Sequence, residues 1–432
     1  MDSNPFRPER PTAPAPHPRL RLGAFVCALL AAATFGCIGP RHDAAGQPGA
    51  NGDLRISGGA ATLAASQPAA ADELQVHFID VGTGDCIWIH TGDDGIAGNG
   101  RLDGLNIIID GGDNGSFGRI DGYTPASDYL ATLLPPGTPI ECLILTHPHS
   151  DHCGGLVGFL EDYPVRTILD PGFDKTEPGQ LPDRLRPKTA YGRFCKTAGT
   201  EVDANGTPAT FVRGIPDGFT LNWGAELAPK ILWSSTEIVD DDLNNVSIVL
   251  RLRFTGAGND AAFLFTGDAE HAVEEQLIAS LGDGLKSTVL KAGHHGSNSS
   301  TTVSFLERVR PAHVVISSGN QPFGEVRLPR TDTFERIRLV SESLGLGTKL
   351  WRTDRDDKEP LLKPVGTEGG DDTVVVRTRG KASDLRIAYA GEETPQLVDA
   401  TRCQALTQAG MQCKRGPKAG STFCWQHQDA NP

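Results

Sequence analysis

The sequence predicts an α/β fold, and three observations support this prediction. Apolar segments rich in β-forming residues, such as 106–112 and 165–170, alternate along the chain with segments of helical character. Aspartates, histidines and glycines follow several of these strands directly, which is where α/β proteins usually carry their sites. With 38% hydrophobic and 22% charged residues over 432 positions, the chain also has enough apolar side chains for a large core.

The predicted elements follow one another in a regular order from residue 74 onward. The first two strands lie within 74–82 and 86–92, around a tight glycine turn. Further strands are expected at 106–112, 141–149, 165–170, 246–254, 261–268, 287–295 and 312–319. Helices are expected at 156–163, 269–281 and 302–308. A loop insertion is expected at 357–372.

The amino-terminal region has the features of an export signal. Arginines precede an apolar run at 24–35, which is too short to span a bilayer and has the length of a signal-peptide core. Cys37 follows a glycine just beyond this run, as in bacterial lipoprotein signals, so residues 1–37 are interpreted as a signal peptide with Cys37 lipidated. The alternative is cleavage by ordinary signal peptidase. The protein is thus expected to be exported, as a membrane-anchored lipoprotein or as a periplasmic or secreted protein.

Residues 38–72 predict a flexible linker. They are rich in Ala, Gly, Pro and Ser and contain no Phe, Trp or Tyr, so they cannot bury enough apolar surface to offset their chain entropy.

Net charge and cysteine count limit the possible functions without deciding among them. The formal net charge of −14 argues against a broadly basic nucleic-acid surface, although bound metal ions can make an active site locally positive. Export would permit disulfides among the four cysteines in the body of the chain, and three pairings remain open. These four are Cys86, Cys142, Cys153 and Cys195.

The densest cluster of candidate metal ligands is the run THPHSDHCGG, residues 146–155. In an extended segment His147 and His149 project to the same side, so both can reach one metal ion. Asp151 and His152 follow one turn later and can reach a second ion. A solvent-exposed polar loop is the alternative, but three histidines and an aspartate at this density after a strand argue against it.

Further candidate ligands end two later strands. Asp268 ends the strand 261–268, where its carboxylate can bridge two ions. His294 and His295 end the strand 287–295. Each alone could be an ordinary loop residue, but as a set at strand ends they favour one shared site.

Eight motifs in this order resemble the metallo-β-lactamase superfamily, and more narrowly the hydrolase domain of ComEC-type competence proteins and their free-standing relatives. They cover roughly 74–380 and read IDVGTGDCIWI, IIIDGG, THPHSDHCGGL, NNVSIVLRL, FLFTGDAE, LKAGHHGSNSS, VISSGN and WRTDRD. The resemblance implies an αββα sandwich, two mixed β-sheets flanked by helices, for a hydrolase domain at 73–398. It also implies an active site with two Zn²⁺ or Mn²⁺ ions.

The resemblance assigns a role to each candidate ligand. It implies that His147 and His149 hold one ion, and that Asp151 and His152 hold the other. It further implies that Asp268 bridges the two ions.

The resemblance also covers the later histidines and three earlier aspartates. It implies that His294 completes the second metal position, with His295 either taking its place or contacting substrate. Asp110 is expected to orient the histidine loop through hydrogen bonds. Asp80 and Asp85 are expected to be structural.

The chain departs from the family pattern in two places. Most members carry a further histidine between the HxHxDH motif and the bridging aspartate, but no histidine occurs here between His152 and His271. The first ion is therefore left one histidine short. Relatives also often carry a histidine after a segment like SSGNQPFG, where this chain has Glu325 and Arg327. Arg327 either contacts an anionic substrate or, in the simpler interpretation, is a surface arginine.

The expected activity is hydrolysis. Two metal ions about 3.5–4 Å apart lower the pKa of a bridging water and stabilise the leaving oxygen. The chain has no GxSxG nucleophile motif, so attack by metal-activated hydroxide is expected, with Asp151 accepting its hydrogen bond and acting as the base.

The resemblance to domains associated with DNA hydrolysis favours a phosphodiesterase, with a DNase as one form of it. The expected partners are therefore an anionic phosphodiester or nucleic-acid substrate, and a membrane through the lipid anchor. The alternatives are a hydrolase of another ester or amide, such as a β-lactam, and a non-catalytic surface-binding protein with a degenerate metal site.

The carboxy-terminal segment, residues 399–432, predicts a small separate module. Cys403, Cys413, Cys424 and His427 have the ligand count of a closed tetrahedral zinc site. The segment resembles small CxxxTxxGxxCKR…YCWQH modules appended to bacterial and phage proteins. One structural zinc ion is expected here, and disulfide pairing is the alternative.

Overall fold

The structure of the chain is a computed structural model that describes residues 69–93, 95, 104–113, 126–172, 188–216, 218–255, 261–319, 326–354 and 372–390. The predicted signal peptide with Cys37, nearly all of the linker, Glu325, the insertion up to residue 371 and the carboxy-terminal Cys/His module lie outside these residues. Among the described residues, no helix is long and apolar enough to cross a membrane.

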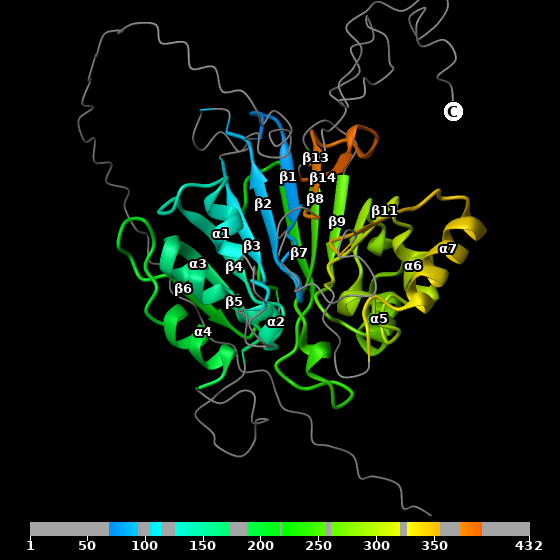
Figure 1. The fold of residues 1–432 in the computed structure, drawn as a ribbon, viewed down its shortest axis with the longest axis horizontal. Coiled ribbons are helices and arrows are strands. Elements are labelled where there is room, and N and C mark those ends of the chain that lie inside the picture. Colours follow the sequence, from blue (N-terminus) through cyan, green and yellow to red (C-terminus); the bar gives the residue numbers. More distant parts are fainter. Residues whose placement is uncertain are drawn as a thin grey trace, which may run out of the picture. The chain divides into compact units, whose positions relative to one another are not determined.

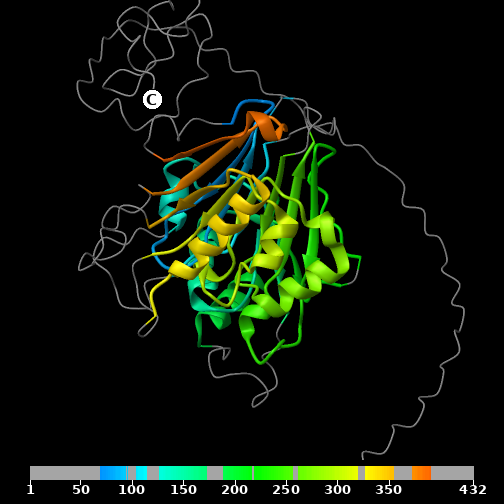
Figure 2. The same ribbon diagram turned by 90° about the vertical axis from the view of Figure 1, so that its right-hand side faces the viewer.

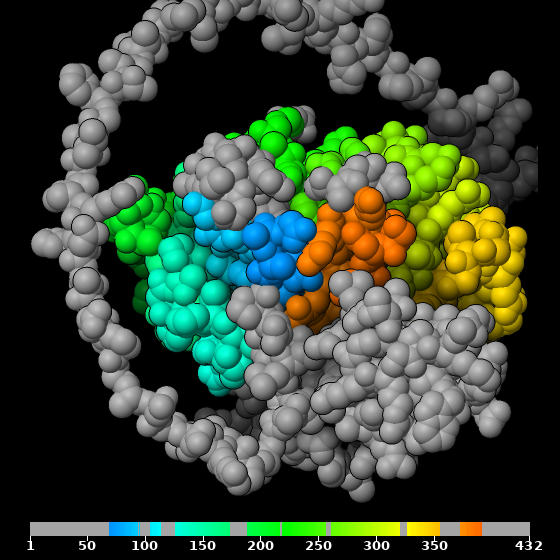
Figure 3. All heavy atoms as spheres, turned by 90° about the horizontal axis from the view of Figure 1, so that it is seen from above, coloured from blue at the N-terminus to red at the C-terminus, as the bar shows by residue number. Residues whose placement is uncertain are grey.

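Two mixed β-sheets form the centre of the fold (Figure 1). The first sheet has the order β14 (Arg386–Tyr389), β13 (Val374–Thr378), β1 (Leu74–Phe78), β2 (Ile87–Thr91), β3 (Asn106–Ile109), β4 (Ile140–Ile144), β5 (Val165–Asp170) and β6 (Thr210–Arg213). Strands β3 to β6 run parallel, and the neighbouring pairs from β14 to β3 are antiparallel. Figure 3 shows the β1–β2 and β13–β14 segments side by side at the surface.

The second sheet has six strands. Its order is β12 (Lys349–Arg352), β11 (His313–Ile316), β10 (Val289–Lys291), β9 (Ala261–Phe265), β8 (Val249–Phe254) and β7 (Leu227–Trp233). Strands β9 to β12 run parallel, while β7, β8 and β9 are antiparallel neighbours.

Helices cover the outer face of each sheet (Figures 1 and 2). The first sheet carries α1 (Ala126–Ala131), α3 (Leu156–Asp162) and α4 (Ala190–Ala198), and the short α2 (Ser150–Cys153) lies at its strand ends. The second sheet carries α5 (His271–Leu281), α6 (Val303–Val309) and α7 (Thr331–Leu344).

The central core lies between the two sheets. Alternate residues of β1, including Val76 and Phe78, pack there against Phe263 and Phe265 of β9, and all four side chains are at most 1% exposed. Two further apolar clusters lie under the outer helices. This arrangement confirms the expected αββα sandwich.

The structure agrees with most predicted elements and adds several. The helix predicted at 156–163 and the strand predicted at 165–170 are present as α3 and β5. The strand predicted at 287–295 is much shorter, since β10 ends at Lys291 and the histidines lie in a following 3₁₀ turn, η4 (Gly293–Gly296). The sequence analysis missed α1, α4, α7, β6, β7 and β14.

A buried histidine in the first sheet should make the fold sensitive to acid. His77 is fully buried, with Nδ1 3.1 Å from the Tyr129 hydroxyl and Nε2 3.1 Å from Gln75 Oε1. Burial, with a smaller contribution from the charge of Arg377, lowers the pKa of His77 to about 3. An unfolded chain has a histidine pKa of about 6.5 and binds more protons in this range, so stability should fall as the pH drops from about 6.5 toward 3.

The variant His77→Gln tests this expectation. At pH 5 the histidine should cost the wild type roughly 2 kcal/mol of unfolding free energy relative to neutral pH, a cost that the variant lacks. Denaturant unfolding at pH 7.5 and pH 5, with chelator present, measures it. Equal losses of stability in the two proteins would contradict the prediction.

Candidate metal centre

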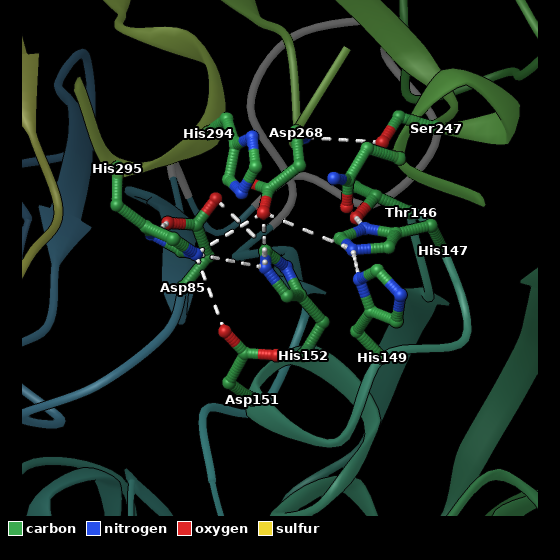
Figure 4. A network of polar contacts seen from close by, with 12 residues as sticks. Asp85, Thr146, His147, His149, Asp151, His152, Ser247, Asp268, His294 and His295 are labelled. Carbon is green, nitrogen blue, oxygen red and sulfur yellow. Dashed lines mark hydrogen bonds and ion pairs between the residues drawn. The ribbon is translucent and has the colours of Figure 1, made fainter. Parts of the chain in front are cut away.

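The candidate ligands come together at strand ends of both sheets (Figure 4). His147 and His149 follow β4, and Asp151 and His152 lie in α2. From the second sheet, Asp268 follows β9, while His294 and His295 lie in η4 after β10. Carboxyl ends of parallel strands meet at one edge of a sheet, which explains why residues far apart in sequence meet here.

Four side chains converge on one point of the centre. Asp268 Oδ2 lies 3.2 Å from His152 Nε2 and 3.1 Å from His295 Nε2. The two imidazole Nε2 atoms are 3.3 Å apart, and Asp151 Oδ2 lies 3.4 Å from His295 Nε2. All four residues are buried.

Asp110 fixes the orientation of His152. Its Oδ2 lies 2.8 Å from His152 Nδ1, and its Oδ1 accepts a 2.7 Å hydrogen bond from the backbone N–H of Thr146. Because the Nδ1 hydrogen points at this carboxylate, the Nε2 lone pair of His152 points toward Asp268. The structure therefore places Asp110 where the sequence analysis expected it, beside the histidine loop.

His295 is held in the same manner. Its Nδ1 lies 3.0 Å from the Ser317 carbonyl oxygen and 3.3 Å from Asp85 Oδ1, so Nε2 is the atom that faces Asp268 and Asp151. The expectation put His294 first for this second metal position, and the structure instead brings the alternative, His295, into it.

His294 points its Nδ1 to a different carboxylate. Glu270 Oε1 lies 2.7 Å from that atom and also accepts a short hydrogen bond from the Ser299 hydroxyl. Figure 4 shows the His294 ring beside Asp268, and its charge contributes to lowering the pKa of His147. His294 therefore lies toward the first metal position.

The two adjacent histidines reach different positions because their backbone is unusual. His294 has φ 44° and His295 has φ 49°, both in the left-handed region that non-glycine residues rarely adopt. Backbone strain of this kind is concentrated at functional sites.

The first metal position is built around His147 and His149. His147 Nε2 lies 3.0 Å from His149 Nδ1 and 3.8 Å from Asp268 Oδ2, while His147 Nδ1 lies 3.2 Å from the Thr146 hydroxyl. Burial, followed by the charge of His152, lowers the pKa of His147 well below its usual range. His147 is therefore a neutral imidazole, the form that binds metal.

The donor set fits a divalent cation. The Nε2 lone pairs of His152 and His295 face each other and a carboxylate oxygen, an arrangement that repels unless a positive charge lies among them. Although burial disfavours the imidazolium form, Asp268 raises the pKa of both histidines well above the usual range. Imidazole nitrogens and carboxylate oxygens are ligands for Zn²⁺ and related ions, so the cluster can hold such an ion.

Asp151 is a carboxylate at neutral pH. Burial raises its pKa, but the hydrogen bond to His295 and the charge of His152 prevail and lower the pKa of Asp151 to about 2. Its Oδ2 can therefore bind a cation or accept a hydrogen bond.

Three residues of the centre were not predicted. Asp85 was expected to be structural, but its carboxylate belongs to the buried group Asp85, His152, Asp268 and His295, whose potential ligand atoms lie within 4.8 Å of one another. Lys291 and Glu270 were not singled out at all, although both stand inside quoted motifs, LKAGHHGSNSS and FLFTGDAE.

Other residues considered earlier lie away from the centre. Asp80 Oδ1 accepts a hydrogen bond from the Gly82 N–H and so supports the turn after β1. His271 is exposed, 3.7 Å from Asp240, and does not supply the missing histidine. Arg327 is exposed. The four cysteines of the body are free thiols, and Cys86, Cys142 and Cys153 are buried.

Residues 101–234 match the family model described as the metallo-beta-lactamase superfamily. Curated relatives include Recombination protein 2 of Haemophilus influenzae, 29% identical over 232 residues, which are 54% of this chain and 24% of the relative. Competence protein ComA of Neisseria gonorrhoeae is 39% identical over 121 residues, which are 28% of this chain and 16% of the relative.

A third relative, ComE operon protein 3 of Bacillus subtilis, is 26% identical over 261 residues, which are 58% of this chain and 29% of the relative. The chain thus spans less than about a third of the length of these three relatives. The match and the two-sheet architecture confirm the metallo-β-lactamase domain and the similarity to competence proteins that the motifs indicated.

Proposed function

We propose that this protein, a hydrolase of the metallo-beta-lactamase superfamily, cleaves phosphodiester bonds with the help of two divalent metal ions. The observation that carries the proposal is the convergence of His152 Nε2, His295 Nε2 and Asp151 Oδ2 around Asp268 Oδ2. Such a preorganised set of nitrogen and oxygen donors is costly to bury without a cation.

The two positions share Asp268. His147, His149 and His294 would hold one ion, so that His294 replaces the histidine missing from the sequence pattern. Asp151, His152 and His295 would hold the other. The ions would activate a water molecule and stabilise the developing negative charge of a phosphodiester.

The residues around the ligands support this chemistry. Asp110 and Glu270 keep His152 and His294 in the tautomer that directs Nε2 inward. Asp151, ionised and buried at the same point, accepts a hydrogen bond from the water and positions it.

Sequence similarity supports the choice of phosphodiesters. The relatives carry names of competence and recombination proteins, which favours a nucleic-acid substrate over a β-lactam. The net charge of −14 makes the metal ions the main source of attraction for an anionic substrate. A hydrolase of another ester or amide is the second candidate.

Chelator-sensitive turnover tests the proposal. The purified chain should hydrolyse bis(p-nitrophenyl) phosphate, lose this activity in EDTA and regain it with Zn²⁺ or Mn²⁺. A panel of single- and double-stranded DNA, RNA and a chromogenic β-lactam should identify the substrate class. Zn²⁺ and Mn²⁺ are added separately, since the donor set accepts both.

The control compares two histidine variants. His295→Ala should abolish chelator-sensitive turnover, whereas His271→Ala, which changes an exposed histidine, should preserve it. Hydrolysis of the β-lactam but of no phosphodiester would overturn the substrate assignment. Binding of polyanions without any turnover would favour the non-catalytic alternative.

We also propose an exported location for this activity. The signal-like segment 1–37 would direct export, with lipidation of Cys37 tethering the domain to a membrane, and the ligands of the 399–432 module would bind a structural zinc ion.

A further inference from the structure

Lys291 is a fully buried lysine at the end of β10, and the proposed function gives it no role. Its Nζ pairs with Asp85 Oδ2, donates a 2.9 Å hydrogen bond to the Gly267 carbonyl oxygen and lies 3.5 Å from Asp268 Oδ1. All of these partners belong to the metal centre or precede it by one residue. The lysine therefore contacts the centre from the side opposite the histidines.

The lysine is charged at neutral pH. Burial alone would lower its pKa, but the carboxylates of Asp85 and Asp268 outweigh burial and raise the pKa of Lys291. A buried ammonium group is tolerated only when it is paired in this manner. The centre thus contains one fixed positive charge that belongs to the protein itself.

The lysine divides the oxygens of two carboxylates. Asp268 turns Oδ2 to the histidines and Oδ1 to Lys291, and Oδ1 is buried without a hydrogen bond. Asp85 turns Oδ2 to Lys291, while its Oδ1 lies 3.3 Å from Nδ1 of His295, the nitrogen that faces away from the metal position.

We propose that Lys291 is a positioning residue of the metal centre. It holds Asp85 beside Nδ1 of His295, as a support for that histidine instead of a metal ligand, and it leaves a single oxygen of Asp268 directed at the histidines. The inference rests on the proposed function to the extent that a metal ion must bind at this centre.

The structure shows what the lysine prevents. The Asp85 carboxylate belongs to a buried group whose potential ligand atoms lie within 4.8 Å of one another. Without the ammonium group, this carboxylate would be buried with no cationic partner, and a nearby divalent ion would be its best replacement. Removal of Lys291 should therefore convert Asp85 from a support into a ligand.

Titration of the chelator-treated protein with Co²⁺ tests this, because visible absorption by Co²⁺ weakens as its coordination number rises. Lys291→Met should show weaker absorption per bound Co²⁺ than the wild type. The double variant Asp85→Asn/Lys291→Met should regain the wild-type spectrum, because asparagine supplies no carboxylate. Lys286→Met, which removes a half-exposed lysine paired with Asp283, serves as the matched control and should match the wild type.

The outcomes separate the inference from the proposed function. A wild-type protein that binds no Co²⁺ overturns both. If the wild type binds Co²⁺ and Lys291→Met has the same spectrum, or if the double variant keeps the altered spectrum, only the inference fails.

If Lys291→Met does not fold, the single variant Asp85→Asn decides. Loss of about 10- to 100-fold in Co²⁺ affinity with an unchanged spectrum supports a supporting role for Asp85. An unchanged affinity, or a spectrum that shows one ligand fewer, overturns it.

Discussion

Replacing Asp268 by Asn should remove metal-dependent turnover almost completely. Its Oδ2 lies within 3.8 Å of Nε2 of His147, His152 and His295, so one carboxylate serves both metal positions. Metal-ion stabilisation of a transition state is worth several kcal/mol, so kcat/KM should fall on the order of 10³-fold or more. Metal content per chain, measured with kcat/KM on bis(p-nitrophenyl) phosphate, checks both parts of the prediction.

Asp170→Asn is the matched control for this variant. Asp170 is also a fully buried aspartate at a strand end, but it accepts hydrogen bonds from the Tyr191 hydroxyl and from Arg213 instead of facing histidines. Its replacement should lower stability and leave metal content unchanged. Two bound ions and undiminished turnover in Asp268→Asn would exclude Asp268 as the shared ligand.

Sequence reasoning located the candidate site because its residues follow apolar strands. His147, His149, Asp151 and His152 stand within six residues, so local geometry alone keeps them close. Asp268 joins them because it ends a strand in the same α/β pattern. Since carboxyl ends of parallel strands meet at a sheet edge, this inference needs no knowledge of the packing.

The assignment of His294 and His295 could not be made in this way. Which histidine reaches which metal position depends on the left-handed backbone at both residues and on the distant Glu270, which takes Nδ1 of His294. The place of Asp85 depends on a buried pairing with Lys291, a residue 206 positions away in sequence. Long-range pairings of charges have no periodicity that a single sequence can reveal.

The missed elements have two different causes. Helix α7 does carry a helical signal, since Phe334, Ile337, Val340 and Leu344 recur at spacings of three and four and pack under the second sheet. Its many charged residues conceal this pattern in composition. Strands β6 and β7, in contrast, are the edge strands of their sheets and are only partly buried, so they lack the apolar runs that mark the central strands.

Gly84→Ala should disrupt the fold and the metal centre together. Gly84 lies in the turn before β2 at φ +107°, and a Cβ there would stand 1.8 Å from the backbone oxygen of Asp151. The next N–H, that of Asp85, donates to the same oxygen at 3.3 Å. The alanine must therefore push the turn away from α2, and Asp85 and Asp151 would separate.

The matched control is Gly137→Ala, because Gly137 also has a positive φ of +85° but its added Cβ would meet nothing within 4 Å. The control should lose only the backbone cost, about 1 kcal/mol of unfolding free energy. Gly84→Ala should lose about 3 kcal/mol more through the steric clash. It should also bind Co²⁺ more weakly, because the clash displaces the backbone that carries Asp151 and His152. Equal losses of stability in the two variants would show that the turn can move freely, and the glycine would then be required only for its backbone angle.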